Sequence, residues 1–118
     1  MIGIDIEATD RFLAWTDKEY SRIFTKQERD YANQFINTTE HFCGFFCVRE
    51  ALVKALNNTE IEYKKIEVLH TETGKPYINQ TKYVKDLIAE KKLFDGTFNI
   101  EISISHCKGY ATAVVLFS

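Results

Sequence analysis

The sequence lacks the features that mark a membrane-spanning or multi-domain chain. Its 118 residues contain no repeat, no low-complexity tract and no linker. No apolar run approaches the ~20 residues that a bilayer-spanning helix needs, so we expect no membrane association. The chain opens on a strand-like segment without a charged-then-apolar leader, which predicts a protein that is not secreted.

Cysteine and net charge are also scarce. There are three cysteines, Cys43, Cys47 and Cys107, and the formal net charge is −2. An odd number of cysteines without a leader predicts reduced thiols and a cytoplasmic location. Cys43 and Cys47 form no zinc pattern with His41 or His70, so we expect these cysteines to serve packing. The small net charge gives no reason to expect a nucleic-acid partner.

The chain is long enough for a single domain, residues 1–118, around one core. A capping box, Thr25 to Glu28, predicts the start of one helix, and hydrophobic periodicity and turn residues predict the rest. The expected elements are strand 2–8, helices 17–24, 26–35 and 40–57, a hairpin of 66–70 and 76–78, helix 81–92, a turn at 94–96, and strands 100–105 and 110–117 joined by 106–109. This order predicts an α+β fold with a mainly antiparallel sheet packed on one long central helix.

The first strand carries a pair of carboxylates. Ile2, Ile4 and Ile6 point to one face, so Asp5 and Glu7 share the other. Two carboxylates side by side are unfavourable unless something cationic lies between them. An edge strand with its polar face in water explains the pair equally well when it is considered alone.

Three other polar groups stand out, each with a purely structural alternative. Glu50 and Lys54 share a narrow polar stripe on the long helix, although an ordinary surface ion pair has the same spacing. Gly74-Lys75-Pro76 is a turn that carries no function by itself. Ser105-His106 ends a strand, where a histidine is often only hydrogen-bonded. A nucleophilic pair of Cys107 with His106 is disfavoured because neighbours on a strand face opposite ways.

Together these groups suit phosphoryl chemistry better than acyl transfer or redox chemistry. Carboxylates from two elements are ligands for a hard divalent ion, above all Mg²⁺, which also takes phosphate oxygens. Lysine, serine, histidine and backbone N–H groups can then offset the remaining phosphate charge. The sequence has no glycine-rich loop, which excludes a Walker-type or Rossmann nucleotide site.

Four motifs follow one another along the whole chain. They are Gly3-Ile4-Asp5-Ile6, Phe46-Cys47-Val48-Arg49-Glu50-Ala51-Leu52-Val53-Lys54-Ala55-Leu56, Thr73-Gly74-Lys75-Pro76 and Ser103-Ile104-Ser105-His106. In order and spacing they resemble holo-acyl-carrier-protein synthase, the small single-domain class of 4′-phosphopantetheinyl transferases. The resemblance implies transfer of 4′-phosphopantetheine from coenzyme A to a serine of an acyl carrier protein in fatty acid biosynthesis, with release of adenosine 3′,5′-bisphosphate.

The resemblance also implies roles for single residues. Asp5 and Glu50 match the Mg²⁺ ligands, and Lys54 matches the lysine beside the pyrophosphate, so these three form the expected catalytic group. Gly74-Lys75-Pro76 matches a turn against the nucleotide end of coenzyme A. Ser105-His106 matches residues that approach the phosphates of coenzyme A.

The resemblance further implies how the protein assembles and docks. The family forms a homotrimer with sites between subunits. Its acidic carrier protein should meet a basic face, and the first helices offer one, although acidic residues are interspersed there. The expected docking residues are Arg11, Lys18, Arg22, Lys26 and Arg29.

Several positions depart from the family pattern. Arg49 replaces a common lysine, Phe45 stands where an arginine is frequent, and Asn57-Asn58 replaces a glycine-containing loop. Glu7 is often uncharged in the small class, and we hypothesise that it is a third protein ligand of Mg²⁺. The departures at 45 and 57–58 keep a non-catalytic carrier-binding homologue open, and a small Mg²⁺-dependent nucleotide hydrolase is a third alternative.

Overall fold

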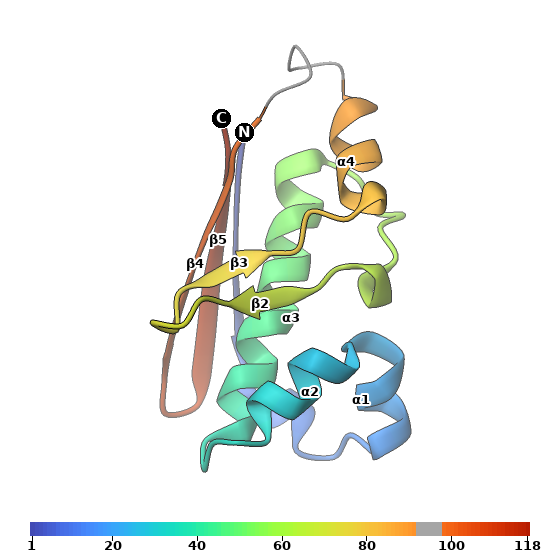
Figure 1. The fold of residues 1–118 in the computed structure, drawn as a ribbon. Coiled ribbons are helices and arrows are strands. Elements are labelled where there is room, and N and C mark those ends of the chain that lie inside the picture. Colours follow the sequence, from blue (N-terminus) through green and yellow to red (C-terminus); the bar gives the residue numbers. More distant parts are fainter. Residues whose placement is uncertain (92–97) are drawn as a thin grey trace.

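The long helix and the antiparallel sheet predicted from the sequence are both present in the computed structural model, which describes residues 1–91 and 98–118. Strands β1 (Ile2–Ala8), β5 (Tyr110–Phe117) and β4 (Ile100–Cys107) form one antiparallel sheet in the order β1-β5-β4. Helix α3 (Thr38–Leu56) lies along one face of this sheet (Figure 1). A separate hairpin of β2 (Val68–His70) and β3 (Pro76–Ile78) crosses α3, with β3 next to β4. The α+β class is confirmed.

Three shorter helices surround α3. Helices α1 (Asp17–Ile23) and α2 (Lys26–Ala32) cover one end, and α4 (Lys82–Ala89) lies near the other end, where both termini are found (Figure 1). Each begins at a threonine whose side chain accepts a backbone N–H, and the predicted capping box of α2 is complete. Two short 3-10 helices, Thr9–Phe12 and Tyr63–Lys65, were not predicted. No helix in the described part of the chain is long and apolar enough to cross a membrane.

Some predicted boundaries were wrong for identifiable reasons. Helix α2 ends at Ala32 rather than residue 35, because the N–H groups of Gln34 and Phe35 bond three residues back and continue as tight turns. Strand β4 runs through Cys107, because a turn at Lys108 and Gly109 suffices to reverse the chain, with Gly109 at φ 93°. Strand β2 starts at residue 68 rather than 66, and α4 spans 82–89 rather than 81–92. The predicted turn at 94–96 lies outside the described residues.

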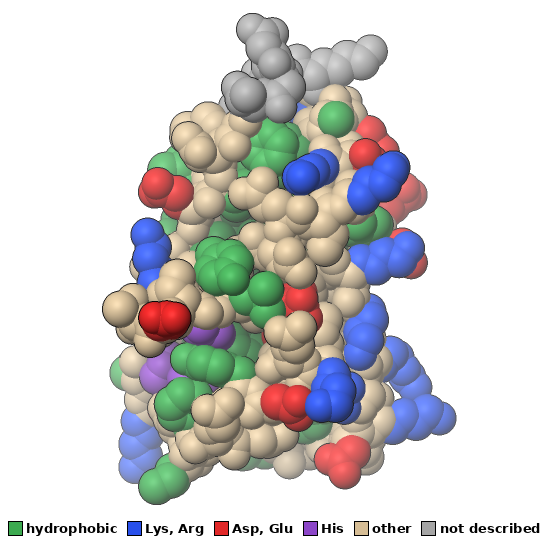
Figure 2. All heavy atoms as spheres, in the orientation of Figure 1, with side chains coloured by type: hydrophobic (Ala, Val, Ile, Leu, Met, Phe, Trp, Pro, Cys, Tyr) green, Lys and Arg blue, Asp and Glu red, His purple; other side chains and the backbone are tan. Residues whose placement is uncertain are grey.

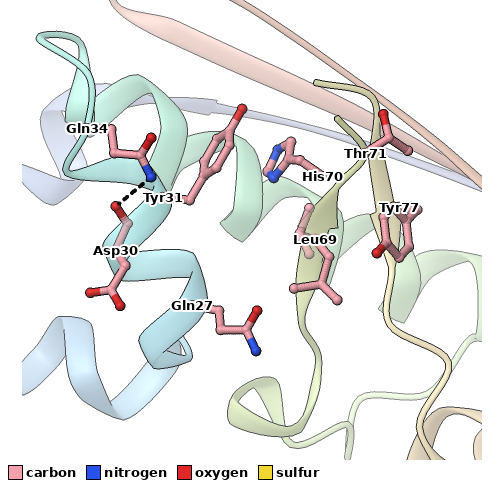
Figure 3. A pocket seen from close by; sticks show the side chains of 9 residues that line it. Gln27, Asp30, Tyr31, Gln34, Leu69, His70, Thr71 and Tyr77 are labelled. Carbon is pink, nitrogen blue, oxygen red and sulfur yellow. Dashed lines mark hydrogen bonds between the residues drawn. The ribbon is translucent and has the colours of Figure 1, made fainter. Parts of the chain in front are cut away.

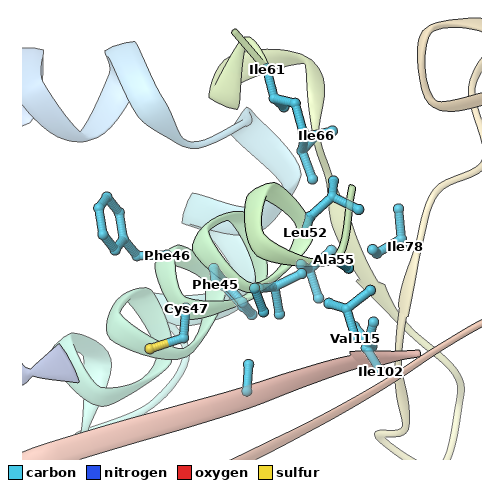
Figure 4. Close-up of a cluster of buried hydrophobic side chains, with 14 of the residues drawn as sticks. Phe45, Phe46, Cys47, Leu52, Ala55, Ile61, Ile66, Ile78, Ile102 and Val115 are labelled. Carbon is cyan, nitrogen blue, oxygen red and sulfur yellow. The ribbon is translucent and has the colours of Figure 1, made fainter. Parts of the chain in front are cut away.

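The core surrounds α3 on almost every side. Every residue from Phe42 to Val48 is buried, and Figure 4 shows side chains of the helix meeting others from the sheet and the hairpin. Cys43 and Cys47 belong to this core, as predicted, and their thiols donate to the carbonyls of Glu7 and Ala111. All three cysteines are free thiols.

A buried ion pair joins α2 to α3. Glu28 and Arg49 are both 0% exposed, and Glu28 Oε1 lies 2.6 Å from Arg49 Nη2. The Glu28 carboxylate also accepts the N–H groups of Thr25 and Val68. Arg49 also donates to backbone carbonyls in α3, at Tyr63 and at Ile66. Every oxygen of this carboxylate is therefore hydrogen-bonded, and the pair ties four segments together.

The two faces of β1 have opposite environments. Ile2, Ile4 and Ile6 are 64%, 64% and 66% exposed, whereas Asp5 lies on the face against α3 and is only 8% exposed. The predicted alternation is confirmed, and the polar face is the inner one. Gly3 permits this close packing, because a Cβ there would lie 1.9 Å from the Ala51 carbonyl oxygen.

Candidate functional site

Asp5 meets the polar stripe of α3 across the contact between strand and helix. Its Oδ1 lies 3.1 Å from Lys54 Nζ, which also donates to the Ile4 carbonyl at 3.0 Å. Its Oδ2 is buried and finds no hydrogen-bond partner among the described residues. A buried carboxylate oxygen without a donor costs free energy. This atom therefore marks a place where a cation or a hydrogen-bond donor would fit.

Glu7 lies beside Asp5 but is held by another group. Its Oε1 lies 2.7 Å from Arg11 Nη1. Burial raises the pKa of Glu7, the neighbouring Asp5 carboxylate raises it further, and Arg11 opposes the shift. The two carboxyl groups of β1 are thus neighbours, as the sequence predicted. That Glu7 is a metal ligand stays a prediction.

Glu50 reaches the same region from α3, one turn before Lys54. Burial raises the pKa of Tyr63, and the charge of Glu50, a hydrogen bond to Glu50 and the charge of Asp5 raise it further. Glu50 and Asp5 both act on the Tyr63 hydroxyl, Glu50 through a hydrogen bond and Asp5 through its charge. That the two carboxylates form one site stays a prediction. Lys54 pairs with Asp5, and the described residues show no ion pair between Lys54 and Glu50. Sequence reasoning missed Tyr63, because it lies on a 3-10 helix without a periodic signal.

The donor set is compatible with Mg²⁺. In the ranges 1–91 and 98–118, no three His, Cys, Asp or Glu side chains are grouped so that they could hold a metal ion. Mg²⁺ needs only one or two protein carboxylates, because it keeps several waters and takes substrate phosphate oxygens. Asp5, with its unpaired Oδ2, and Glu50 fit that requirement.

Ser105 and His106 face opposite sides of the sheet. Ser105 pairs with Thr112, on the outer face that carries the exposed isoleucines. His106 pairs with Ala111 on the inner face, and its Nδ1 lies 3.4 Å from Glu40 Oε2. One chain alone therefore does not bring these two predicted phosphate contacts together.

The hairpin turn contributes to a small pocket. Its volume is about 120 Å³, and its lining residues are Tyr31, His41, Phe45, His70, Gly74, Pro76, Ile104 and His106. Gly74 stands at φ 89°, a conformation that glycine adopts without strain. The pocket thus joins Gly74 and Pro76 to His106, whereas Lys75 is not part of the lining. Sequence reasoning missed Tyr31, His41 and His70 in this role, since only the fold brings them together.

Comparison with known proteins agrees with this architecture. Residues 1–115 match the 4′-phosphopantetheinyl transferase superfamily. The holo-[acyl-carrier-protein] synthase of Protochlamydia amoebophila is 35% identical over 124 residues, covering 99% of this chain and 96% of that protein. The enzyme of the same name from Fusobacterium nucleatum is 33% identical over 119 residues, covering 98% and 95%.

Solved structures share the fold. The ACPS–CoA complex of Chronobacterium ammoniagenes superposes with a TM-score of 0.83 at 25% identity, covering 100% of this chain and 96% of that one. Holo-[acyl-carrier-protein] synthase of Helicobacter pylori in complex with coenzyme A has a TM-score of 0.80 at 26% identity, covering 100% of both chains. The chain therefore belongs to the 4′-phosphopantetheinyl transferase superfamily. Within it, the relatives named here are holo-[acyl-carrier-protein] synthases, which confirms the resemblance seen in the sequence motifs.

Proposed function

We propose that this chain transfers 4′-phosphopantetheine from coenzyme A to a serine of an acyl carrier protein and releases adenosine 3′,5′-bisphosphate. The observation that carries the proposal is the buried, unpartnered Oδ2 of Asp5, next to Lys54 and near Glu50. Buried structural carboxylates usually have both oxygens hydrogen-bonded. Family membership over residues 1–115 supports the same chemistry.

Asp5 and Glu50 would hold Mg²⁺ in this site. When bound, the ion supplies positive charge to the phosphate oxygens and polarises the phosphorus for attack. Lys54 lies where its ammonium can stabilise the charge that develops on the leaving phosphate. A carboxylate of this cluster accepts the proton of the carrier serine. Burial of Asp5 against α3 excludes water and strengthens these interactions.

The exposed isoleucine face supports assembly into a homotrimer. Ile2, Ile4 and Ile6 alternate on the outer face of β1, and Leu116 of neighbouring β5 is 41% exposed on the same face. A contiguous apolar strip of this kind is typical of an interface. Ser105 lies on that outer face, so a neighbouring subunit would bring it into a shared site, with the Gly74-Lys75-Pro76 turn near the nucleotide end of coenzyme A.

The docking surface for the carrier protein is proposed on the first helices. Arg11 and Lys26 are engaged in ion pairs with Glu7 and Asp30, respectively. Arg29 donates to the Ser21 hydroxyl. Among the described residues, Lys18, Arg22 and Arg29 take part in no ion pair, so their charges remain available to an acidic partner. The free state of all three cysteines agrees with a cytoplasmic location.

One assay tests the proposed function. The protein is incubated with apo carrier protein, coenzyme A and Mg²⁺, and the carrier is weighed by mass spectrometry. A mass gain of one phosphopantetheine is the expected result. Complex formation without a mass gain would indicate a non-catalytic carrier-binding homologue, and breakdown of coenzyme A without carrier would indicate a hydrolase.

A further inference from the structure

Each carboxylate of β1 is held by a cation from another element. Lys54 on α3 lies 3.1 Å from Asp5, and Arg11, on the 3-10 helix Thr9–Phe12, lies 2.7 Å from Glu7. The proposed reaction already uses Lys54 at the leaving phosphate. Arg11 is the neighbouring cation to which that reaction gives no part.

The side chain of Glu7 can change its partner while its backbone stays in place. Glu7 pairs with Ala111 in the sheet, and its carbonyl accepts the Cys43 thiol. Its carboxylate, in contrast, meets an arginine side chain that is 47% exposed. An exposed ion pair contributes little to stability, because water and salt compete with it. An acidic group of a partner protein can therefore take Arg11 from Glu7 at little cost.

Arg11 also belongs to the proposed docking surface. The Tyr20 hydroxyl of α1 donates to the Phe12 carbonyl at 2.8 Å, and Trp15 packs edge-on against both rings. The 3-10 helix and α1 therefore form one unit. Figure 2 shows Lys and Arg side chains, with Asp and Glu among them, on the side of the molecule where α1 lies. The Arg11 guanidinium, 4.4 Å from the centre of the Phe46 ring, thus connects the carboxylates of β1 to that surface.

We propose that Arg11 is a positioning residue that couples docking of the acidic carrier protein to the Mg²⁺ site. This inference rests on the proposed function. Without the carrier, Arg11 neutralises Glu7. A carboxylate of the docked carrier takes over Arg11 and leaves Glu7 with its full charge beside Asp5. Neighbouring carboxylates without a cation repel each other and attract a divalent ion, so the site binds Mg²⁺ more tightly when the carrier is present.

The coupling acts in both directions. If the carrier raises the affinity for the ion by some factor, the ion raises the affinity for the carrier by the same factor. The site is then most complete when the carrier serine is present to attack. This coupling disfavours breakdown of coenzyme A by water in the absence of carrier.

Binding measurements without coenzyme A test the coupling, because no transfer can then occur. Mn²⁺ replaces Mg²⁺, since both ions prefer oxygen ligands, and electron paramagnetic resonance measures the concentration of free Mn²⁺. The ion is titrated into the whole protein with and without saturating apo carrier protein, and binding to the carrier alone is subtracted. We expect the carrier to lower the dissociation constant for Mn²⁺ about fivefold or more.

Two variants show whether Arg11 and Glu7 carry this effect. Arg11→Gln should bind Mn²⁺ about fivefold more tightly than the wild type without carrier, and the carrier should then change little. The double variant Arg11→Gln with Glu7→Gln keeps the net charge of the paired state. It should return to the weaker affinity of the wild type and show no response to the carrier. A merely structural ion pair would not move these constants in opposite directions.

Lys26→Gln is the matched control. Lys26 and Asp30 form an ion pair of the same 2.7 Å length and the same four-residue spacing, also on the proposed docking surface. Asp30 lines a groove of about 390 Å³ between α2 and the β2–β3 hairpin, and the described lining includes no residue of β1 (Figure 3). This variant should bind the carrier more weakly at most and keep the full effect of the carrier on Mn²⁺ affinity.

The outcomes separate this inference from the proposed function. Equal Mn²⁺ affinity of the wild type with and without the carrier overturns the inference, and so does an unchanged carrier effect in Arg11→Gln. A mass gain of the carrier in the transfer assay keeps the proposed function standing in both cases. No Mn²⁺ binding together with no mass gain would overturn both.

Discussion

Two buried carboxylates of this protein have opposite surroundings. Glu28 is 0% exposed, and both its oxygens receive hydrogen bonds, from Arg49 and from two backbone N–H groups. Asp5 is 8% exposed, and one of its oxygens has no partner among the described residues. Both oxygens of Glu28 therefore have hydrogen-bond partners. Asp5 Oδ2, in contrast, has no hydrogen-bond donor beside it among the described residues.

The difference separates a structural role from a chemical one. A fully paired buried charge cannot bind anything more, and it joins the segments that surround it. Buried polar atoms in native proteins are nearly always hydrogen-bonded, so an unsatisfied buried oxygen points to a place for a ligand or a water. The predictions below disturb one carboxylate or its surroundings at a time.

The largest expected effect is on the structural pair. Arg49→Met leaves Glu28 buried without its cation, so we expect a loss of about 3–5 kcal/mol in the free energy of unfolding. Urea unfolding measures this loss. The double variant Glu28→Leu with Arg49→Met should recover part of it, because no unpaired charge remains. Lys26→Gln, which removes an exposed pair, should change stability by less than about 0.5 kcal/mol. A loss below about 1 kcal/mol for Arg49→Met would contradict the structural role.

The next effect concerns the backbone that carries Asp5. Gly3→Ala places a Cβ 1.9 Å from the Ala51 carbonyl oxygen, and this backbone atom cannot move aside cheaply. We expect a loss of about 1–3 kcal/mol together with a lower transfer rate, because β1 must shift away from α3. Gly44→Ala is the matched comparison, since its Cβ would lie 2.8 Å from a side-chain methyl, Ile104 Cγ2, and not against backbone. Equal stability of the two variants would show that β1 tolerates the shift.

Glu7 tests how far the chemical site extends. If Glu7 is a third Mg²⁺ ligand, Glu7→Gln should weaken the apparent Mg²⁺ affinity of the transfer reaction about tenfold. The rate at saturating Mg²⁺ should change less. An unchanged Mg²⁺ dependence would limit Glu7 to its ion pair with Arg11.

The smallest expected effect lies on the docking surface of the first helices. Arg22→Glu should raise the KM for the carrier protein about threefold to tenfold and leave the KM for coenzyme A unchanged, because a charge at the rim of an interface acts mainly on association. Steady-state kinetics with each substrate varied in turn measures both constants. Equal changes in both would argue against docking at this helix.

Local patterns were sufficient to predict much of the fold and part of the site. Alternation in β1 predicted that Asp5 and Glu7 share a face, and helical spacing predicted Glu50 and Lys54 one turn apart. The Asp5–Lys54 contact required the strand to lie on the helix, which no short pattern encodes. The Glu28–Arg49 pair and the histidine pocket are also long-range, and their members carry no common motif. Tyr63 was missed because a single turn of 3-10 helix leaves no periodicity to detect.

The most direct test of the contrast between the two carboxylates is Asp5→Asn, measured for both stability and transfer rate. An amide keeps the shape of the side chain and removes the charge that has no full set of partners. We predict a transfer rate reduced about 100-fold or more, with a free energy of unfolding equal to or higher than that of the unaltered protein. A stability loss as large as that of Arg49→Met, or an unchanged transfer rate, would contradict the assignment of Asp5 to the chemistry.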